Sequence, residues 1–160
     1  MTPGKLRADL VAERAAWVRT MTARLRELPL GSLEAFESDP RNAAAAESYL
    51  RRALEGLLDL GRHVLANGFG RATTEHEEIA DGLAEGGVLA EPMALKLREV
   101  AGYRNRMVHF YDQVTVPELY RICSADLGDV DATLEAILRW IAGVPERVEG
   151  GAAPDREAGA

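Results

Sequence analysis

Four polar side chains suited to phosphodiester chemistry lie within one eight-residue stretch, residues 104–111 (RNRMVHFY). Arg104 carries a permanent charge on a planar fork that matches phosphate geometry. His109 is the side-chain type most readily poised to give or take a proton near neutral pH. Asn105 both donates and accepts hydrogen bonds, and Tyr111 adds a hydroxyl. These residue types suit metal-independent cleavage of RNA, whose own 2′-hydroxyl attacks the adjacent phosphorus while the protein transfers protons and stabilises charge.

Helical geometry decides whether these side chains act together. At ~100° per residue, Tyr111 returns to within ~20° of Arg104. His109 lies ~40° from Asn105, so the four share a continuous polar arc of ~160°. Residue types and spacing alone leave an alternative open, in which Arg104 pairs with an acid, His109 caps the helix end and Tyr111 half-buries its ring.

The charge balance limits the kind of nucleic-acid contact. A net charge of −7 and a pI near 5.0 exclude a general nucleic-acid coat protein, which needs a basic surface. A small nucleic-acid contact is still expected beside the motif. Lys96 and Arg98 precede it, Arg106 lies within it, and Glu99 is the one acidic residue among them. These three cations are the predicted RNA-binding residues.

Composition predicts one all-α domain. The chain has 160 residues, of which 47% are hydrophobic, which is enough for one buried core. Ala, Leu, Glu and Arg, all good helix formers, dominate it. No apolar run approaches the ~20 residues of a membrane span, and charges from Lys5 onward argue against a signal peptide. We therefore expect a cytoplasmic protein without membrane contact.

Start and stop signals bound the first two expected helices. The first begins at Thr2, with proline in its first turn, and ends before Pro29. The second is capped by Asp39 and stops at the Asn67-Gly68 pair.

Three further helices follow. Thr74 and Glu77 form a candidate capping box for the third, which ends at Gly86. The fourth opens at Glu91 and carries the motif in its second half. A capping box that begins at Thr115 opens the fifth. About five helices with short connections predict an up-and-down bundle over residues 1–145. Residues 146–160 lack apolar periodicity and are expected to form a disordered tail.

Five residues outside the motif carry structural expectations. Gly56 and Gly61 lie inside the second helix, where glycine permits close approach of a neighbouring helix. His63 sits among apolar positions and is expected to be a satisfied structural histidine, whereas His76 is expected to be solvated. Cys123, the single cysteine, excludes an intrachain disulfide and a cysteine-rich zinc site, and is expected in the core.

Residues 104–111 resemble the Arg-x4-His-x-Tyr signature of the HepT-like toxins, a branch of the HEPN ribonuclease superfamily. The resemblance extends, in order, to residues 49–65 (YLRRALEGLLDLGRHVL), the acidic and apolar segment 79–89, and residues 103–120 (YRNRMVHFYDQVTVPELY). It covers roughly residues 1–143, and the signature is intact.

This resemblance implies a homodimeric all-α bundle that serves as the toxin of a bacterial toxin–antitoxin pair. It implies a metal-independent endoribonuclease without a cofactor, in which two copies of the motif meet in one cleft at the dimer interface. Arg104, Asn105 and His109 take the catalytic positions. The implied partner is an MntA-type minimal nucleotidyltransferase antitoxin, which transfers AMP from ATP to Tyr111.

Two alternatives stay open on the sequence. In the first, the chain is a non-catalytic helical partner of a nucleotidyltransferase and uses residues 104–111 for docking. In the second, it is a plain helical bundle without an active site.

Overall fold

The computed structural model of the chain describes residues 4–109 and 114–150. Its helices are α1 (Ala8–Arg26), α2 (Leu33–Glu37), α3 (Pro40–Phe69), α4 (His76–Glu85), α5 (Glu91–His109), α6 (Val116–Ala125), α7 (Leu127–Ala142) and the short 3-10 helix η1 (Pro145–Arg147). Two short strands, β1 (Leu6–Arg7) and β2 (Val148–Glu149), complete it. The predicted all-α class is confirmed.

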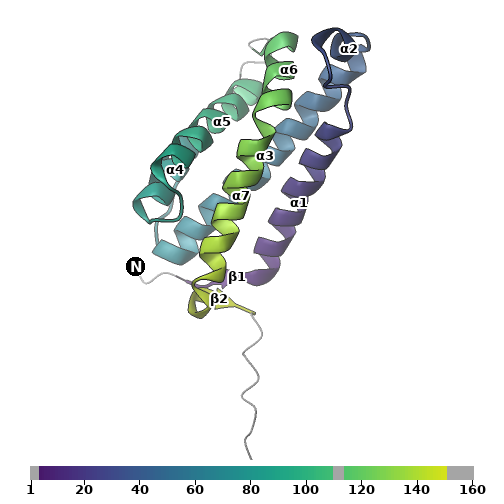
Figure 1. Ribbon diagram of the computed structural model, residues 1–160. Coiled ribbons are helices and arrows are strands. Elements are labelled where there is room, and N and C mark those ends of the chain that lie inside the picture. The colour runs from purple at the N-terminus through teal and green to yellow at the C-terminus, as the bar shows by residue number, and fades with distance from the viewer. Residues whose placement is uncertain (1–3, 110–113, 151–160) are drawn as a thin grey trace, which may run out of the picture.

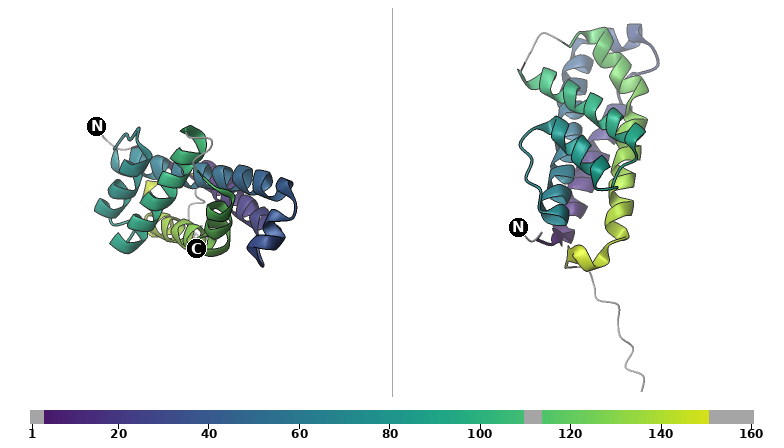
Figure 2. Two further views of the ribbon diagram at one scale, coloured as in Figure 1. Left: turned by 90° about the horizontal axis from the view of Figure 1, so that it is seen from above. Right: turned by 90° about the vertical axis from the view of Figure 1, so that its left-hand side faces the viewer.

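The long helices alternate in direction (Figure 1). Helix α1 runs toward the end of the bundle where α2 lies, α3 returns from it, α5 runs toward it again, and α6 and α7 lead back. Helices α1 and α3 pack side by side, and α4 packs on α5 at one flank of α3 (Figure 2). Leucine is the commonest residue of the core between them, and several side chains of α3 are fully buried, including Leu50, Leu60 and Leu65.

The expected number of helices was wrong, because the described residues contain seven α-helices rather than five. Helix α2 forms in the predicted turn region, where the Ser32 side chain accepts a hydrogen bond from the Ala35 amide and Phe36 is fully buried. Burial of the Phe36 ring stabilises this single helical turn, which is too short for hydrophobic periodicity in the sequence to reveal. The expected fifth helix is split at Asp126 into α6 and α7.

Two predicted helix caps are confirmed. The Asp39 carboxylate accepts a hydrogen bond from the Arg41 amide at 2.9 Å, and Pro40 occupies the first turn of α3. The Thr115 hydroxyl accepts from the Glu118 amide at 3.3 Å at the start of α6. Both signals therefore mark true helix starts.

Two predicted signals were misplaced. Helix α4 begins at His76 without a side-chain cap, so Thr74 does not close a capping box. Helix α3 continues through Gly68 to Phe69 and ends at Gly70, whose φ of 65° is the left-handed conformation that glycine adopts without strain. Burial of Gly68 within the bundle favours the helix over the local stop signal.

The two ends of the described chain pair with each other. Leu6 and Arg7 form a parallel ladder with Val148 and Glu149, and Leu6 is fully buried. The first helix therefore begins at Ala8, not at Thr2, which lies outside the described residues. Ordered structure likewise extends past residue 145 into η1 and β2, so the expected tail does not begin at 146. Residues 151–160 lie outside the described range.

Glycines permit two close helix contacts, as predicted. A Cβ atom on Gly56 would lie 2.9 Å from Cδ1 of Trp17 on α1. A Cβ atom on Gly61 would lie 2.7 Å from Cγ2 of Ile79 on α4. Cys123 is buried, as expected, and burial raises the pKa of its thiol to about 12. In the part of the chain that the structure describes, no helix is both long and apolar enough to span a membrane.

Candidate active site

Helix α5 carries the described part of the motif, residues 104–109, in its last turns, as predicted. Arg104 and Asn105 precede His109, which is the final residue of the helix, and basic groups in a last turn favour the helix dipole. Helix α3 lies behind this segment, α4 beside it, and α6 follows it in the chain. Tyr111, the predicted modification site, lies outside the described residues.

The side chain of Asn105 is held from two directions. Its Oδ1 lies 3.1 Å from Nδ1 of His76, the first residue of α4. Nη1 of Arg104 donates to the same oxygen at 3.4 Å. Burial, and then the charge of Arg104, lower the pKa of His76. The expectation that His76 is merely solvated was wrong, since it contacts the motif.

Arg104 is turned largely inward. Its side chain is 18% exposed, and Nη2 lies 3.5 Å from Oε1 of Glu55 on α3. Nε is buried and has no hydrogen-bond partner among the residues that the structure describes. The alternative in which Arg104 pairs with an acid is therefore observed in the isolated chain. Before any substrate binds, the charge of Arg104 is therefore already paired with the Glu55 carboxylate.

His109, in contrast, is exposed at the end of α5 and forms no hydrogen bond or ion pair among the described residues. Asn105 lies one turn before it on the same helix. The imidazole is therefore accessible to a ligand that also reaches the Asn105 amide.

The predicted RNA-binding cations each contact a carboxylate on a neighbouring helix. Lys96 pairs with Asp129 at 2.9 Å, Arg98 with Asp81 at 2.8 Å, and Arg106 with Glu118 at 2.6 Å. Arg106 is bidentate to Glu118 and turned toward α6, which indicates a bracing role. The other two pairs are about half exposed on the cation side, and exposed ion pairs are weak. Their RNA-binding role stays a prediction.

Two residues of this site were missed by sequence reasoning. His76 stands 29 positions from Asn105 in sequence, and Glu55 comes from a different helix than Arg104. No local spacing links them to the motif. Only the packing of α3 and α4 against α5 brings these side chains together, so no signal in a single sequence could have found them.

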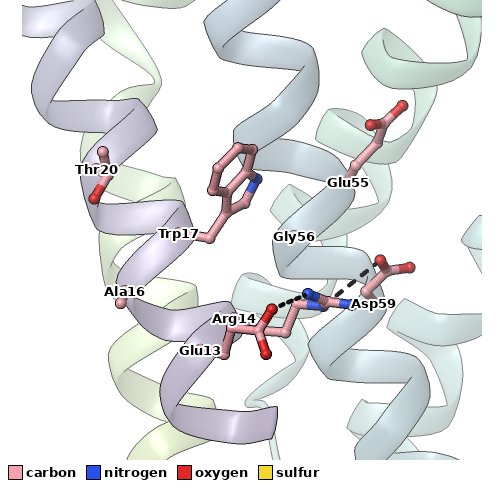
Figure 3. A pocket seen from close by; sticks show the side chains of 8 residues that line it. All are labelled: Glu13, Arg14, Ala16, Trp17, Thr20, Glu55, Gly56 and Asp59. Carbon is pink, nitrogen blue, oxygen red and sulfur yellow. Dashed lines mark hydrogen bonds and ion pairs between the residues drawn. The ribbon is translucent and has the colours of Figure 1, made fainter.

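A pocket of about 500 Å³ lies between α1 and α3 (Figure 3). Trp17 points across it toward Gly56. Its charges are already paired, since Arg14 lies 3.3 Å from Glu13 and 3.9 Å from Asp59. None of the predicted site residues that the structure describes lines it, although Glu55 contacts both the pocket and Arg104 of the motif. The pocket is therefore not the candidate active site.

Comparisons with solved structures show what this fold is similar to. The tri-AMPylated HEPN toxin of Shewanella oneidensis, in complex with its MNT antitoxin, superposes with a TM-score of 0.74 at 18% identity, over 82% of this chain and 98% of that one. A toxin–antitoxin structure with AMP-PNP gives 0.73 at 18% identity, over 81% and 98%. YutE of Bacillus subtilis, a cytosolic protein of unknown function, gives 0.71 at 19% identity, over 90% and 93%. At such identities the likeness establishes the fold.

A search of curated proteins finds no match. The sequence model described as "Ribonuclease HepT-like" matches residues 18–137, which is most of the chain and includes all four motif positions. The chain therefore belongs to the HepT-like ribonuclease family.

Proposed function

We propose that this protein is the toxin of a cytoplasmic bacterial toxin–antitoxin pair and a metal-independent endoribonuclease. The observation that carries the proposal is the arrangement of Asn105, held by two donors on its carbonyl oxygen, one turn before the exposed imidazole of His109. Membership of the HepT-like ribonuclease family supports it.

The proposed reaction needs two proton transfers. The 2′-oxygen of RNA attacks phosphorus and loses its proton, while the bond from phosphorus to the 5′-oxygen breaks and that oxygen gains a proton. The products are a 2′,3′-cyclic phosphate and a free 5′-hydroxyl. One imidazole cannot be base and acid in the same step, so His109 needs a second group. A two-fold dimer supplies the partner subunit's His109.

Gly102 supports a homodimer built on α5. A Cβ atom there would meet nothing within 4 Å among residues 4–109 and 114–150. Packing within this part of the chain does not explain a glycine that costs ~1 kcal/mol in a helix relative to alanine. Leu95, which is 59% exposed, and His109 fall within ~40° of Gly102 on the helix. Close approach of a second α5 at Gly102 explains the glycine, covers Leu95 and brings both motif segments into one interface.

The dimer is tested by Gly102→Leu, with Gly128→Leu on α7 as a matched control, because Gly128 also has open space around it. Sedimentation velocity is expected to show a dimer for the wild type and the control, and a monomer for Gly102→Leu. A monomeric wild type would remove this part of the proposal.

The antitoxin is proposed to be an MNT-type nucleotidyltransferase that attaches AMP to Tyr111. The fold of this chain resembles that of an AMPylated toxin bound to such an antitoxin. In the sequence, Tyr111 follows Arg104 by seven residues, about two helical turns, and this spacing predicts that both face the same side. A phosphate ester there adds negative charge beside the guanidinium and repels incoming RNA.

The decisive experiment combines purified protein with RNA and compares wild type with His109→Ala, each with and without EDTA. The wild type is expected to leave 2′,3′-cyclic phosphate ends in both conditions, and His109→Ala to lose activity by at least ~100-fold. His63→Gln is the matched histidine control and is expected to retain activity. Loss of cutting with EDTA would contradict metal independence.

The second candidate function is a non-catalytic helical partner of a nucleotidyltransferase. The observation that favours it is the inward pairing of Arg104 with Glu55, which is typical of a structural arginine. Induced expression separates the two. A nuclease toxin arrests growth through His109 and loses this effect as His109→Ala, whereas a docking module arrests growth in neither form.

A further inference from the structure

The amide of Asn105 has a defined orientation. Arginine has only donor groups, so the atom that accepts from Nη1 of Arg104 must be the amide oxygen. The same oxygen lies 3.1 Å from Nδ1 of His76, so this nitrogen must carry the proton that it donates. The two contacts together fix the orientation of the Asn105 amide and show that Nδ1 of the His76 imidazole is protonated.

This assignment leaves the Nδ2 group of Asn105 available. None of the described residues accepts a hydrogen bond from Nδ2, whose two hydrogens point away from the shared oxygen. A phosphate has only acceptor oxygens to offer. An Asn105 side chain that turned over would present its own oxygen and repel the phosphate instead.

His76 is placed to prevent that rotation. It is the first residue of α4, which packs on α5, and its backbone is therefore fixed by the bundle (Figure 1). Buried Ile79 and Ala80, in the next turn, anchor α4. Nδ1 of His76 donates to Asn105 in the neutral imidazole and in the imidazolium alike, so the contact survives protonation.

We propose that His76 is a positioning residue, which holds the Asn105 amide with its Nδ2 group toward the scissile phosphate. This inference rests on the proposed nuclease function and adds a residue outside the motif to its site. His76 acts through Asn105, and the proton transfers stay with His109.

Substitutions of His76 test the role. His76→Ala removes the donor and is expected to lower kcat for RNA cleavage by about 10-fold or more, because a misplaced group near the reacting atoms costs up to ~100-fold. His76→Asn places an amide nitrogen where Nδ1 stood and is expected to restore most of the activity. The pH profile of kcat is expected to keep its limbs in His76→Asn, since the donor does not titrate.

A double-variant cycle adds a readout that a purely structural residue would not move. With Asn105→Ala already present, His76→Ala is expected to cause no further loss, because its effect passes through that amide. Thermal unfolding of each variant checks that the fold is kept. Full activity in His76→Ala, or additive losses in the cycle, would overturn the proposal. If His76→Asn lost as much activity as His76→Ala and the pH profile of kcat shifted, His76 would be a proton-transfer group rather than a positioning residue.

Nitrogen-15 NMR of the imidazoles separates this inference from the nuclease proposal. The neutral form of His76 is expected to carry its proton on Nδ1 in the wild type, whether or not the protein cleaves RNA. A proton on Nε2 would refute the positioning contact even in an active enzyme. A protein that shows the Nδ1 proton but cuts no RNA would refute the nuclease function and leave the positioning role without a reaction to serve.

Discussion

Oε1 of Glu55 lies 3.5 Å from Nη2 of Arg104, and this contact links α3 to the motif helix. The distance is that of an ion pair without a close hydrogen bond. Glu55 also lies 3.6 Å from Nη1 of Arg51 on its own helix. The Glu55 carboxylate therefore competes with any phosphate for Arg104. When Arg104 binds a phosphate instead, Glu55 can still pair with Arg51.

Removal of the Glu55 charge is expected to strengthen RNA binding. Glu55→Gln, made in the inactive His109→Ala background, should raise affinity about five-fold, which corresponds to ~1 kcal/mol for one partly exposed charge. Fluorescence anisotropy with a labelled RNA measures it, and the gain should shrink with added salt.

Glu135→Gln is the matched control, because Glu135 pairs with Arg19 at 2.6 Å and involves no motif residue. The control should bind RNA as the parent does. Weaker binding by Glu55→Gln would show instead that the carboxylate orients Arg104 for the substrate.

Tyr111→Phe is expected to keep RNA cleavage and growth arrest while it escapes AMP transfer. The reason is that the acceptor hydroxyl is lost and the imidazole and guanidinium remain. Mass spectrometry after incubation with an MntA-type nucleotidyltransferase and ATP measures the modification.

Tyr103→Phe and Tyr120→Phe are the controls and should still be modified. The Tyr103 hydroxyl donates to Glu99 at 2.9 Å, and the Tyr120 hydroxyl to the Leu30 carbonyl at 3.2 Å, so both are engaged within the bundle. AMP on either of these tyrosines would contradict the assignment to Tyr111.

Gly61→Ala is expected to destabilise the fold by about 1–3 kcal/mol, because its new methyl group would overlap Ile79 and force α3 and α4 apart. Gly128→Ala should instead add about 0.5 kcal/mol, since none of the described residues lies within 4 Å of its Cβ position and alanine favours a helix. Urea unfolding at one protein concentration measures both. Equal stability of the two variants would show that the contact with Ile79 yields without cost.

Stability is expected to fall as pH drops through the range in which His63 titrates. Its Nε2 accepts from the Arg7 amide at 3.0 Å, which requires a neutral imidazole. Burial, with a smaller effect of Arg7, lowers the pKa of His63 below its usual 6.5, and Asp9 opposes this. The unfolded chain therefore binds the proton first, so this stability is present above pH 6.5 and is lost as pH falls toward the folded pKa.

His63→Gln separates this effect from other titrations. The glutamine oxygen can accept from the same amide and has no charge to gain, so the variant should lose less stability than the wild type between pH 7 and about pH 5. Thermal unfolding across that range measures the difference. Parallel curves would exclude His63 as the titrating group.

Local signals in the sequence predicted much of the scaffold. The caps at Asp39 and Thr115 were correct because a cap is a contact between neighbours in sequence. The close approaches at Gly56 and Gly61 were correct because an interior glycine needs a packing reason. The misplaced end of α3 arose where burial of Gly68 in the bundle outweighed the local stop signal, and nothing in the sequence pattern marked the split at Asp126.

The sequence by itself determined the all-α class, the helix that carries Arg104, Asn105 and His109, and the family to which those residues point. Helix periodicity and a contiguous motif need no knowledge of distant contacts. Only the tertiary structure decided that Glu55 holds Arg104 and that His76 meets Asn105. Those partners lie on other helices, and the packing that unites them depends on the shape of the whole core.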